Sequence, residues 1–300
     1  LLIRSGSQNI NIRDCHFHGT AIDPYGDYSS AQPAKILGIG NDGTAAPSNV
    51  IISGCEFHDL YRGIGMRCVG ALQLDANYVH EFYTIGIQIT QEPGSAETIL
   101  YDNKLVGGIS NQFDFNNPHS DFIQLVGLPN TEWTGIKILQ TRIVSKYPRA
   151  FTQGIFVRGG AGFVADGIEV DRTLLVSKFL TSCGIRIAGA KNAIVRRRTV
   201  VSSGLFPAGP GPGIMVGEEE SVGTHTIELN ATDYLNIFGA YQSSNNKVLG
   251  YGGSVVPYED AFIGPTFSPL SAEEATANFS MKPGGPLDIP NIGAYGTGLI

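Results

Sequence analysis

Charged residues are scarce in this chain: Asp, Glu, Lys and Arg make up 16% of its 300 residues. A disordered chain is therefore excluded, because disorder requires high charge and low hydrophobicity. The net charge of −7 and the isoelectric point near 5.3 predict no nucleic acid partner, since proteins that bind phosphate backbones usually carry a basic face. The only dense basic cluster, Arg196 to Arg198, is predicted to be a solvated turn with one arginine stacked in the repeat column described below.

Cysteine and long hydrophobic runs are also rare. The four cysteines form no CxxC pair, which argues against a zinc cage or a redox motif. No run of 18 apolar residues is present, so we expect no membrane span. The chain begins at Leu1 without methionine and already in strand-like sequence, and we expect it to be part of a longer chain or assembly.

Two short patterns repeat along the chain. The first is a strand that ends in a small polar residue, and alignment on that residue gives one column of eight positions: Cys15, Cys55, Asn77, Asn103, Thr141, Thr173, Arg198 and Thr232. Their uneven spacing excludes helical repeats of fixed length, and the apolar alternation has the period of two that strands require. Cys15 and Cys55 occupy adjacent places, so we expect stacked buried thiols in preference to a disulfide.

The second pattern is a glycine-led strand at residues 63–66, 86–89, 122–125, 154–157, 184–187 and 213–216, with phenylalanine in place of glycine in the third copy. Together the patterns predict an all-β solenoid of about eight coils over residues 1–254. Residues 255–300 are rich in proline and glycine, and Ser271 and Glu274 form a capping box for one short helix. We expect this segment to cover the C-terminal end of the solenoid, whose edge strands would otherwise be unpaired.

The glycine-led strands, the column of Asn, Thr and Cys, and the closing sequence from Ile289 to Tyr295 resemble right-handed parallel β-helix proteins of the pectate-lyase-like superfamily. This superfamily includes polysaccharide lyases, glycoside hydrolases, uronate epimerases and phage tailspikes. The resemblance therefore implies a right-handed parallel β-helix, a polysaccharide or cell-surface glycan as partner, and an extracellular location, or the virion surface for a tailspike. Fold alone does not determine the chemistry.

An extended sugar chain can lie along side chains that project from successive coils about 4.8 Å apart. If the isoleucine of each glycine-led strand points inward, then the next residues form an outward row that contains Gln88, Gln124, Phe156 and Arg186. Arg158 belongs to a second outward row, two residues further on. We assign Gln88, Gln124, Gln153 and Phe156 to substrate binding. The alternative for Gln88 and Gln124 is a structural amide ladder.

The strongest candidate for chemistry is the sequence from Asn116 to Asp121, which leads directly into one of these strands. It brings His119 and Asp121 to the start of a strand in the middle of the solenoid. In the superfamily, acidic residues at this place hold calcium or act in catalysis, and Asp121 matches such a position. His119 replaces a second carboxylate, which argues against calcium, so no cofactor is predicted, and Ca2+ is kept only as a weakly supported alternative. The alternative is that His119 and Asp121 only bind turn backbone.

Elimination from a uronate needs a base, a group that neutralises the carboxylate, and a proton donor. His119 can serve as the base, and Arg158 and Arg186 can neutralise the carboxylate. Hydrolysis needs two carboxyl groups roughly 5 to 9.5 Å apart, and only Asp121 is placed on this face, whereas Asp102, Asp114 and Glu97 lie in turns of unknown direction. A polysaccharide lyase is therefore favoured over a hydrolase, with catalytic residues His119, Asp121, Arg158 and Arg186.

Trp133, the only tryptophan, is the preferred aromatic residue for stacking on a sugar ring. The alternative function is a phage tailspike or another attachment protein that binds glycans without turnover. A tailspike would be a homotrimer with apolar outward rows at its contacts. Lys137 and Glu169 indicate that the outward row at this contact is exposed to solvent, whereas Ile194 does not.

Overall fold

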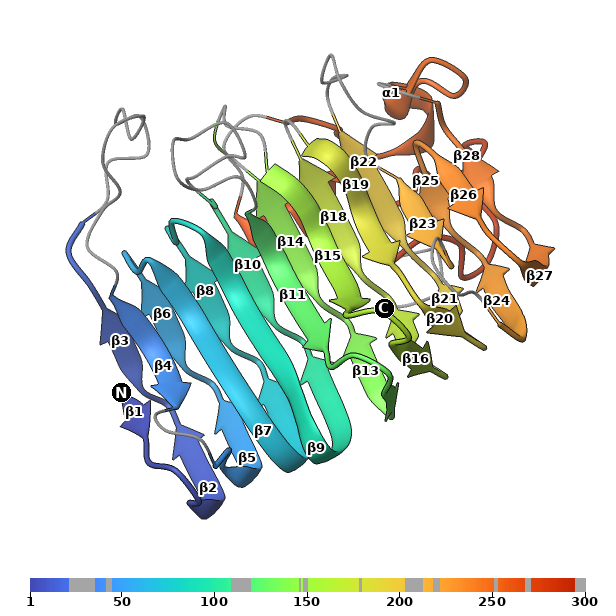
Figure 1. Cartoon of the computed structure of the whole chain (residues 1–300). Coiled ribbons are helices and arrows are strands. Elements are labelled where there is room, and N and C mark those ends of the chain that lie inside the picture. Colours follow the sequence, from blue (N-terminus) through green and yellow to red (C-terminus); the bar gives the residue numbers. More distant parts are fainter. Residues whose placement is uncertain are drawn as a thin grey trace.

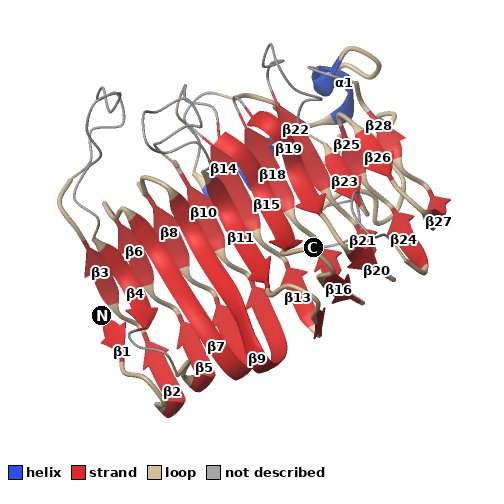
Figure 2. Ribbon diagram, viewed as in Figure 1, coloured by secondary structure: helices blue, strands red, loops and turns tan. Residues whose placement is uncertain are grey.

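The chain is a parallel β-helix, in which three long sheets wind around one axis (Figures 1 and 2). The structure is a computed structural model. It describes residues 1–21, 36–41, 45–108, 120–145, 147, 151–177, 180–202, 213–217, 222–250, 253–267 and 271–294, and the side chains of 151–152 and 180–183 are outside the description. The predicted fold class is confirmed.

Each coil passes through three sheets in turn, and all strand pairs between coils are parallel. Sheet 1 contains β1 (Leu2–Ile3), β4 (Leu37–Asn41), β7 (Arg62–Asp75), β9 (Ile85–Tyr101), β11 (Asp121–Gly127), β15 (Phe151–Gly159), β19 (Leu180–Ile187), β23 (Ile214–Val216) and β26 (Leu235–Ile237). Sheet 2 contains the second halves of β7 and β9, which curve from sheet 1, with β2 (Gln8–Arg13), β5 (Ser48–Ser53), β13 (Ile136–Leu139), β17 (Glu169–Asp171), β21 (Ile194–Arg196), β24 (Thr224–Glu228) and β27 (Ala240–Ser244).

Sheet 3 closes each coil. It contains β3 (His16–His18), β6 (Glu56–His58), β8 (Tyr78–His80), β10 (Lys104–Val106), β14 (Arg142–Ser145), β18 (Leu174–Ser177), β22 (Thr199–Ser202), β25 (Ala231–Thr232) and β28 (Lys247–Val248). A small additional sheet is formed by β12 (Glu132–Thr134), β16 (Val164–Asp166) and β20 (Ala190–Lys191). The helices of the described residues are α1 (Tyr258–Ala261) and α2 (Ala272–Asn278), and neither is long and apolar enough to cross a membrane.

The bend from sheet 2 to sheet 3 depends on one residue with positive φ in every coil: Asp14, Gly54, Ala76, Asp102, Gln140, Arg172, Arg197, Leu229 and Asn245. The residue after it occupies the predicted column. Seven of the eight predicted positions are confirmed, but Thr232 is wrong by two residues. Leu229 makes the bend with a φ of 56°, so Asn230 takes that place, and Asn246 in a further coil follows it.

Side-chain amides in this column replace the backbone bonds that the bend interrupts. Asn77 accepts a hydrogen bond from the Cys55 amide (3.1 Å) and donates to the Ile52 carbonyl (2.9 Å). Asn103 repeats the arrangement one coil later, with a bond of 2.9 Å to the Leu74 carbonyl. Because buried amides without partners are costly, these side chains stabilise the corner of each coil.

The interior is a set of stacked apolar rows. The isoleucines of the glycine-led strands are in register and fully buried, as predicted: Ile64, Ile87, Ile123, Ile155, Ile185 and Ile214. Phe17 and Phe57 stack in the same way, with ring centroids 4.8 Å apart. The glycines that precede the isoleucines leave room for sheet 3, since a Cβ on Gly154 would lie 1.9 Å from Leu175 Cδ1.

Residues 253–267 and 271–294 lie along the outer side of sheet 3. Their apolar side chains, among them Tyr258, Phe262, Phe279 and Leu287, pack against Val144 and its neighbours in the sheet. The predicted capping box of Ser271 and Glu274 is present at α2. The segment leaves β27, the last strand of sheet 2, exposed at every residue, and the expectation that it covers the end of the solenoid stays a prediction. The division of the chain at residue 254 stays a prediction.

Two further sequence predictions concern single side chains. Cys15 and Cys55 are free thiols, as expected, but only Cys55 is buried, whereas Cys15 is half-buried. Burial raises the pKa of Cys55. Arg196 and Arg197 are half-buried, whereas Arg198 stacks in the column, as predicted, and is fully buried. Burial lowers the pKa of its guanidinium well below the ordinary value.

Candidate functional site

The outer side of sheet 1 brings together most of the residues predicted to act on a glycan. Gln88, Gln124, Phe156 and Arg186 are paired in register on β9, β11, β15 and β19. Arg158 pairs with Val126 in the second row. The two predicted rows are therefore confirmed as neighbours on successive coils, at the usual strand spacing of about 4.8 Å.

A chain of hydrogen bonds runs across three of these side chains. The Gln88 amide donates to Gln124 Oε1, and Gln124 Nε2 donates to Asp121 Oδ2 at 3.0 Å. Asp121 is fully buried. The two glutamines therefore form an amide ladder that holds the Asp121 carboxylate in one orientation, and their hydrogen bonds are already directed at each other.

Gln153 lies beside Asp121, because the two residues are paired in register on β15 and β11. It is fully buried, and neither its Nε2 nor its Oε1 atom has a hydrogen-bond partner. A buried amide without a partner is unfavourable, and such groups are common at binding and catalytic sites. Gln153 is thus a described polar side chain of this face with unused hydrogen-bonding capacity.

Arg158 and Arg186 cover the ring of Phe156. Their guanidinium carbons lie 5.6 and 5.2 Å from the ring centroid, within the range of a cation–π contact. Phe156 is only 2% exposed, so its ring is not open for stacking on a sugar, and its assignment to substrate binding stays a prediction. Its ring instead positions two cations, of which Arg158 is exposed and Arg186 half-buried.

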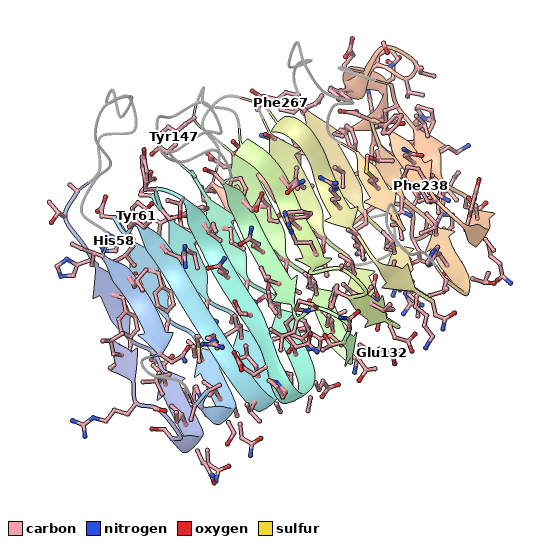
Figure 3. All side chains as sticks on the ribbon, viewed as in Figure 1. His58, Tyr61, Glu132, Tyr147, Phe238 and Phe267 are labelled. Carbon is pink, nitrogen blue, oxygen red and sulfur yellow. The ribbon has the colours of Figure 1, made fainter. Side chains whose placement is uncertain are left out.

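Trp133 is not part of this face. It lies in β12 of the small sheet, next to Glu132 (Figure 3), and is 1% exposed within the apolar core. The prediction that it stacks on a sugar is therefore wrong. Half-buried aromatic rings lie instead at the upper edge of the molecule, where Tyr61 and Tyr147 pack around Tyr83 (Figure 3). Tyr61 directly precedes β7 and stands two residues before Gly63, the first residue of a glycine-led strand.

Arg62 is a further residue that the sequence analysis missed. It begins β7 and pairs in register with Ile85 at the start of β9. Burial lowers the pKa of its guanidinium, and its Nε atom has no hydrogen-bond partner. The signal in the sequence was its place directly before a glycine-led strand, which is also where Gln153 stands with respect to Gly154.

The second carboxylate that hydrolysis requires is not supplied by Asp102 or Glu97. Asp102 lies at the bend between sheets 2 and 3 and bonds to Arg142 at 2.6 Å. Glu97 lies on sheet 2 and bonds to Lys137 at 2.6 Å. His119 and Asp114 are outside the described residues. In the described ranges, no three His, Cys, Asp or Glu side chains gather as a metal site.

Comparisons with known proteins add no relative. No family model, no curated protein and no solved structure matches the chain.

Proposed function

We propose that the outer side of sheet 1 binds an acidic polysaccharide. The observation that carries the proposal is the pair of guanidinium groups, Arg158 and Arg186, held over Phe156 on adjacent coils. Arginine binds carboxylates through two parallel hydrogen bonds, and a guanidinium already positioned on a ring loses little freedom on binding. An extended anionic chain that runs along the solenoid axis would meet one cation on each of two coils.

The fold supports the same proposal. The rows of sheet 1 continue over several coils without interruption, so a long polymer can contact equivalent positions one after another. The resemblance to the pectate-lyase-like superfamily agrees with this use of the face. It supplies the class of ligand only, because one fold hosts many chemistries.

Elimination from a uronate is a second candidate function at the same face. A base would take the proton from C5, the bond between C4 and its oxygen would break as a C4–C5 double bond forms, and the leaving oxygen would take a proton. The observation that favours it is the pair of Asp121, held by Gln124, and Gln153, whose amide has no partner. His119 remains the proposed base, and the two arginines would neutralise the substrate carboxylate.

The test measures binding and turnover separately. The protein is titrated with polygalacturonate, alginate and hyaluronan, with dextran as the neutral control, by calorimetry. We expect Arg158→Gln and Arg186→Gln each to weaken binding about 10-fold, since a charge-assisted hydrogen bond contributes roughly 1.5–3 kcal/mol. Arg13→Gln, on sheet 2, is the matched control and should bind normally. Equal affinity of the double arginine variant and the wild type would refute the proposal.

Turnover is followed by the ultraviolet absorbance of the unsaturated product and by reducing ends. Unsaturated product from wild type, lost in Asp121→Asn with binding retained, would support elimination. Reducing ends without unsaturation would indicate hydrolysis. Binding without any product would favour an attachment protein, the alternative that the sequence left open.

A further inference from the structure

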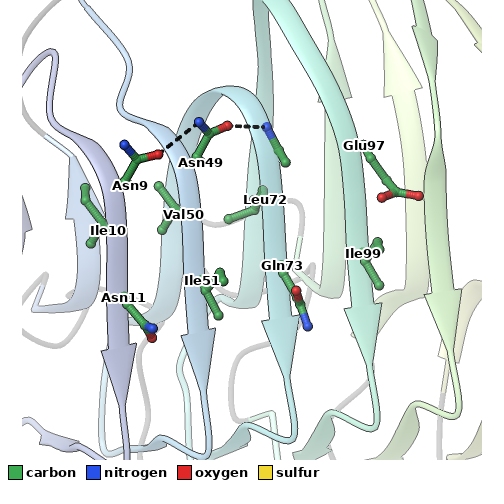
Figure 4. Close-up of a pocket in the computed structure, with 11 residues that line it drawn as sticks. Asn9, Ile10, Asn11, Asn49, Val50, Ile51, Leu72, Gln73, Glu97 and Ile99 are labelled. Atoms are coloured by element: carbon green, nitrogen blue, oxygen red, sulfur yellow. Dashed lines mark hydrogen bonds between the residues drawn. The ribbon is translucent and has the colours of Figure 1, made fainter.

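A groove lies on sheet 2 (Figure 4). Its lining contains neither Arg158 nor Arg186 of sheet 1. It has a volume of about 310 Å³ and crosses β2, β5, β7 and β9. Its floor is one row of outward side chains that are paired in register, Asn11, Ile51, Gln73 and Ile99. Three steps of about 4.8 Å give this row a length of roughly 14 Å along the solenoid axis.

The rim of the groove is held by hydrogen bonds within the protein. Asn49 Nδ2 donates to Asn9 Oδ1 at 3.1 Å, and the Ala71 amide donates to Asn49 Oδ1 at 3.3 Å (Figure 4). Asn9 and Asn49 both have positive φ, near 52°, which brings their amides above the strands. The groove is therefore formed before any ligand arrives, so binding would require little ordering of the rim.

The groove carries no unbalanced charge. Glu97 is the only ionisable residue of its lining, and its carboxylate bonds to Lys137 Nζ at 2.6 Å. Asn11 Oδ1 accepts a hydrogen bond from Arg13 Nε at 2.7 Å, which leaves the Asn11 side-chain amino group, Nδ2, available. Gln73 makes no hydrogen bond to a described residue, and it is half-buried between the half-buried Ile51 and Ile99.

These features argue against several classes of ligand. No residue of the lining is a cation, and the Arg13 guanidinium, which lies beside the groove, is bonded to Asn11, so an acidic glycan is disfavoured. An apolar ligand would leave the Gln73 amide without a partner. An extended peptide binds by adding a strand to the edge of a sheet, whereas the backbone of β5 and β7 in this groove is already paired on both sides. A neutral sugar fits, because its hydroxyl groups both donate and accept, and its C–H groups can pack on isoleucine.

We propose that this groove, lined by Asn11, Ile51, Gln73 and Ile99, binds a short neutral oligosaccharide that lies along the solenoid axis. The Gln73 amide and the Asn11 amino group bind ring hydroxyls two coils apart, and Ile51 and Ile99 contact the sugar rings between and beside them. The site is separate from the sheet 1 face, so its test does not depend on the proposed function.

The experiment follows the methyl signals of Ile51 and Ile99 by NMR in isotope-labelled protein, with assignments from Ile51→Leu and Ile99→Leu. Cellohexaose, xylohexaose, mannohexaose and maltohexaose are titrated to roughly 10 mM, a range that detects weak binding. Hexagalacturonate is the acidic comparison. We expect saturable shifts of both methyl signals with at least one neutral sugar and none with the acidic one.

Gln73→Ala should weaken this binding about 10-fold, the effect of losing one or two hydrogen bonds. Gln73→Glu, which keeps the shape of the side chain and adds a negative charge, provides a second variant. Methyl spectra that match those of the wild type in the absence of sugar show that the two Gln73 variants are folded. Arg186→Gln on sheet 1 should leave the shifts unchanged. The proposal is overturned if no neutral sugar shifts either methyl signal, if only hexagalacturonate does, or if Gln73→Ala binds as tightly as wild type.

Discussion

Replacing Arg198 with methionine should stabilise the protein, although the change removes a charge and three hydrogen-bond donors. Arg198 is fully buried in the column at the bend between sheets 2 and 3. Its Nε, Nη1 and Nη2 atoms have no hydrogen-bond partner, and its nearest carboxylate oxygen, Asp171 Oδ1, lies 3.9 Å from Nη1. Burying a guanidinium costs several kcal/mol, and a contact at this distance offsets only part of that cost.

Asp171 would keep its partner in the variant. Arg197 Nε donates to Asp171 Oδ1 at 2.8 Å, and Arg197 Nη2 bonds to the other carboxylate oxygen. Replacing buried ionic groups with apolar ones of similar size is often stabilising by about 1–4 kcal/mol. Methionine fills most of the volume of arginine, so we expect a gain of roughly 1–3 kcal/mol in the free energy of unfolding.

The assay is thermal unfolding by calorimetry at neutral pH. A gain of this size should raise the Tm by roughly 2–4 °C per kcal/mol. Arg197→Met is the matched control, and it should lower the Tm because it removes two charge-assisted bonds from Asp171. A fall in Tm for Arg198→Met of the same size as for Arg197→Met would refute the reasoning, since it would mean that the Arg198 guanidinium is as well bonded as that of Arg197.

Three further predictions test the corners, the sheet packing and the C-terminal segment. Asn77→Ala leaves the Cys55 amide and the Ile52 carbonyl without partners and should cost roughly 3 kcal/mol by urea denaturation, whereas Asn11→Ala on the surface should cost under about 1 kcal/mol. Gly154→Ala places a Cβ 1.9 Å from Leu175 Cδ1 and should lower the Tm. Gly65→Ala meets only the flexible Arg62 side chain, so a Tm equally low in both variants would contradict the packing argument. Burial raises the pKa of Asp233 to about 8, and the Tyr258 hydroxyl lies 2.6 Å from its Oδ1 atom. Because the pKa of Asp233 is higher in the folded than in the unfolded protein, the protonated carboxyl contributes fully to the free energy of unfolding below about pH 4. That contribution is lost as the pH rises to about 8, by up to roughly 1.4 kcal/mol per pH unit. Asp233→Asn should flatten that part of the stability profile, and an unchanged slope in the variant would show that Asp233 is not its source.

The candidate site shows what a repeat pattern can predict. Gln88, Gln124, Phe156 and Arg186 were placed in one row because strand residues of successive coils must stack in register. The pattern could not tell which side chains of that row face solvent. Phe156 points outward but is buried beneath two arginines. Its burial depends on the way in which two long side chains, one from its own coil and one from the next coil, fold back over the ring.

The sequence does indicate that sheet 3 is covered on its outer side, although the alternation of apolar residues with a period of two does not reveal it. Strands β14, β18 and β22 are apolar or small at nearly every position, and they are buried on both sides. Strands β3 and β6 of the same sheet alternate instead. A continuous apolar run in a strand indicates cover on both faces. The run predicts that something covers sheet 3, but not which segment does so.

The sequence by itself determined the period of two, the inward isoleucine rows, the amide column and the capping box of Ser271 and Glu274. These features depend on residues that are neighbours in the chain or on equivalent places in successive coils, so the pattern of residues is sufficient. Only the tertiary structure decided that Arg198 and Trp133 are buried, that Leu229 shifts the eighth bend, and that the described residues of the C-terminal segment lie along sheet 3. Burial depends on contacts with segments distant in sequence, and no local pattern encodes which segment will supply them.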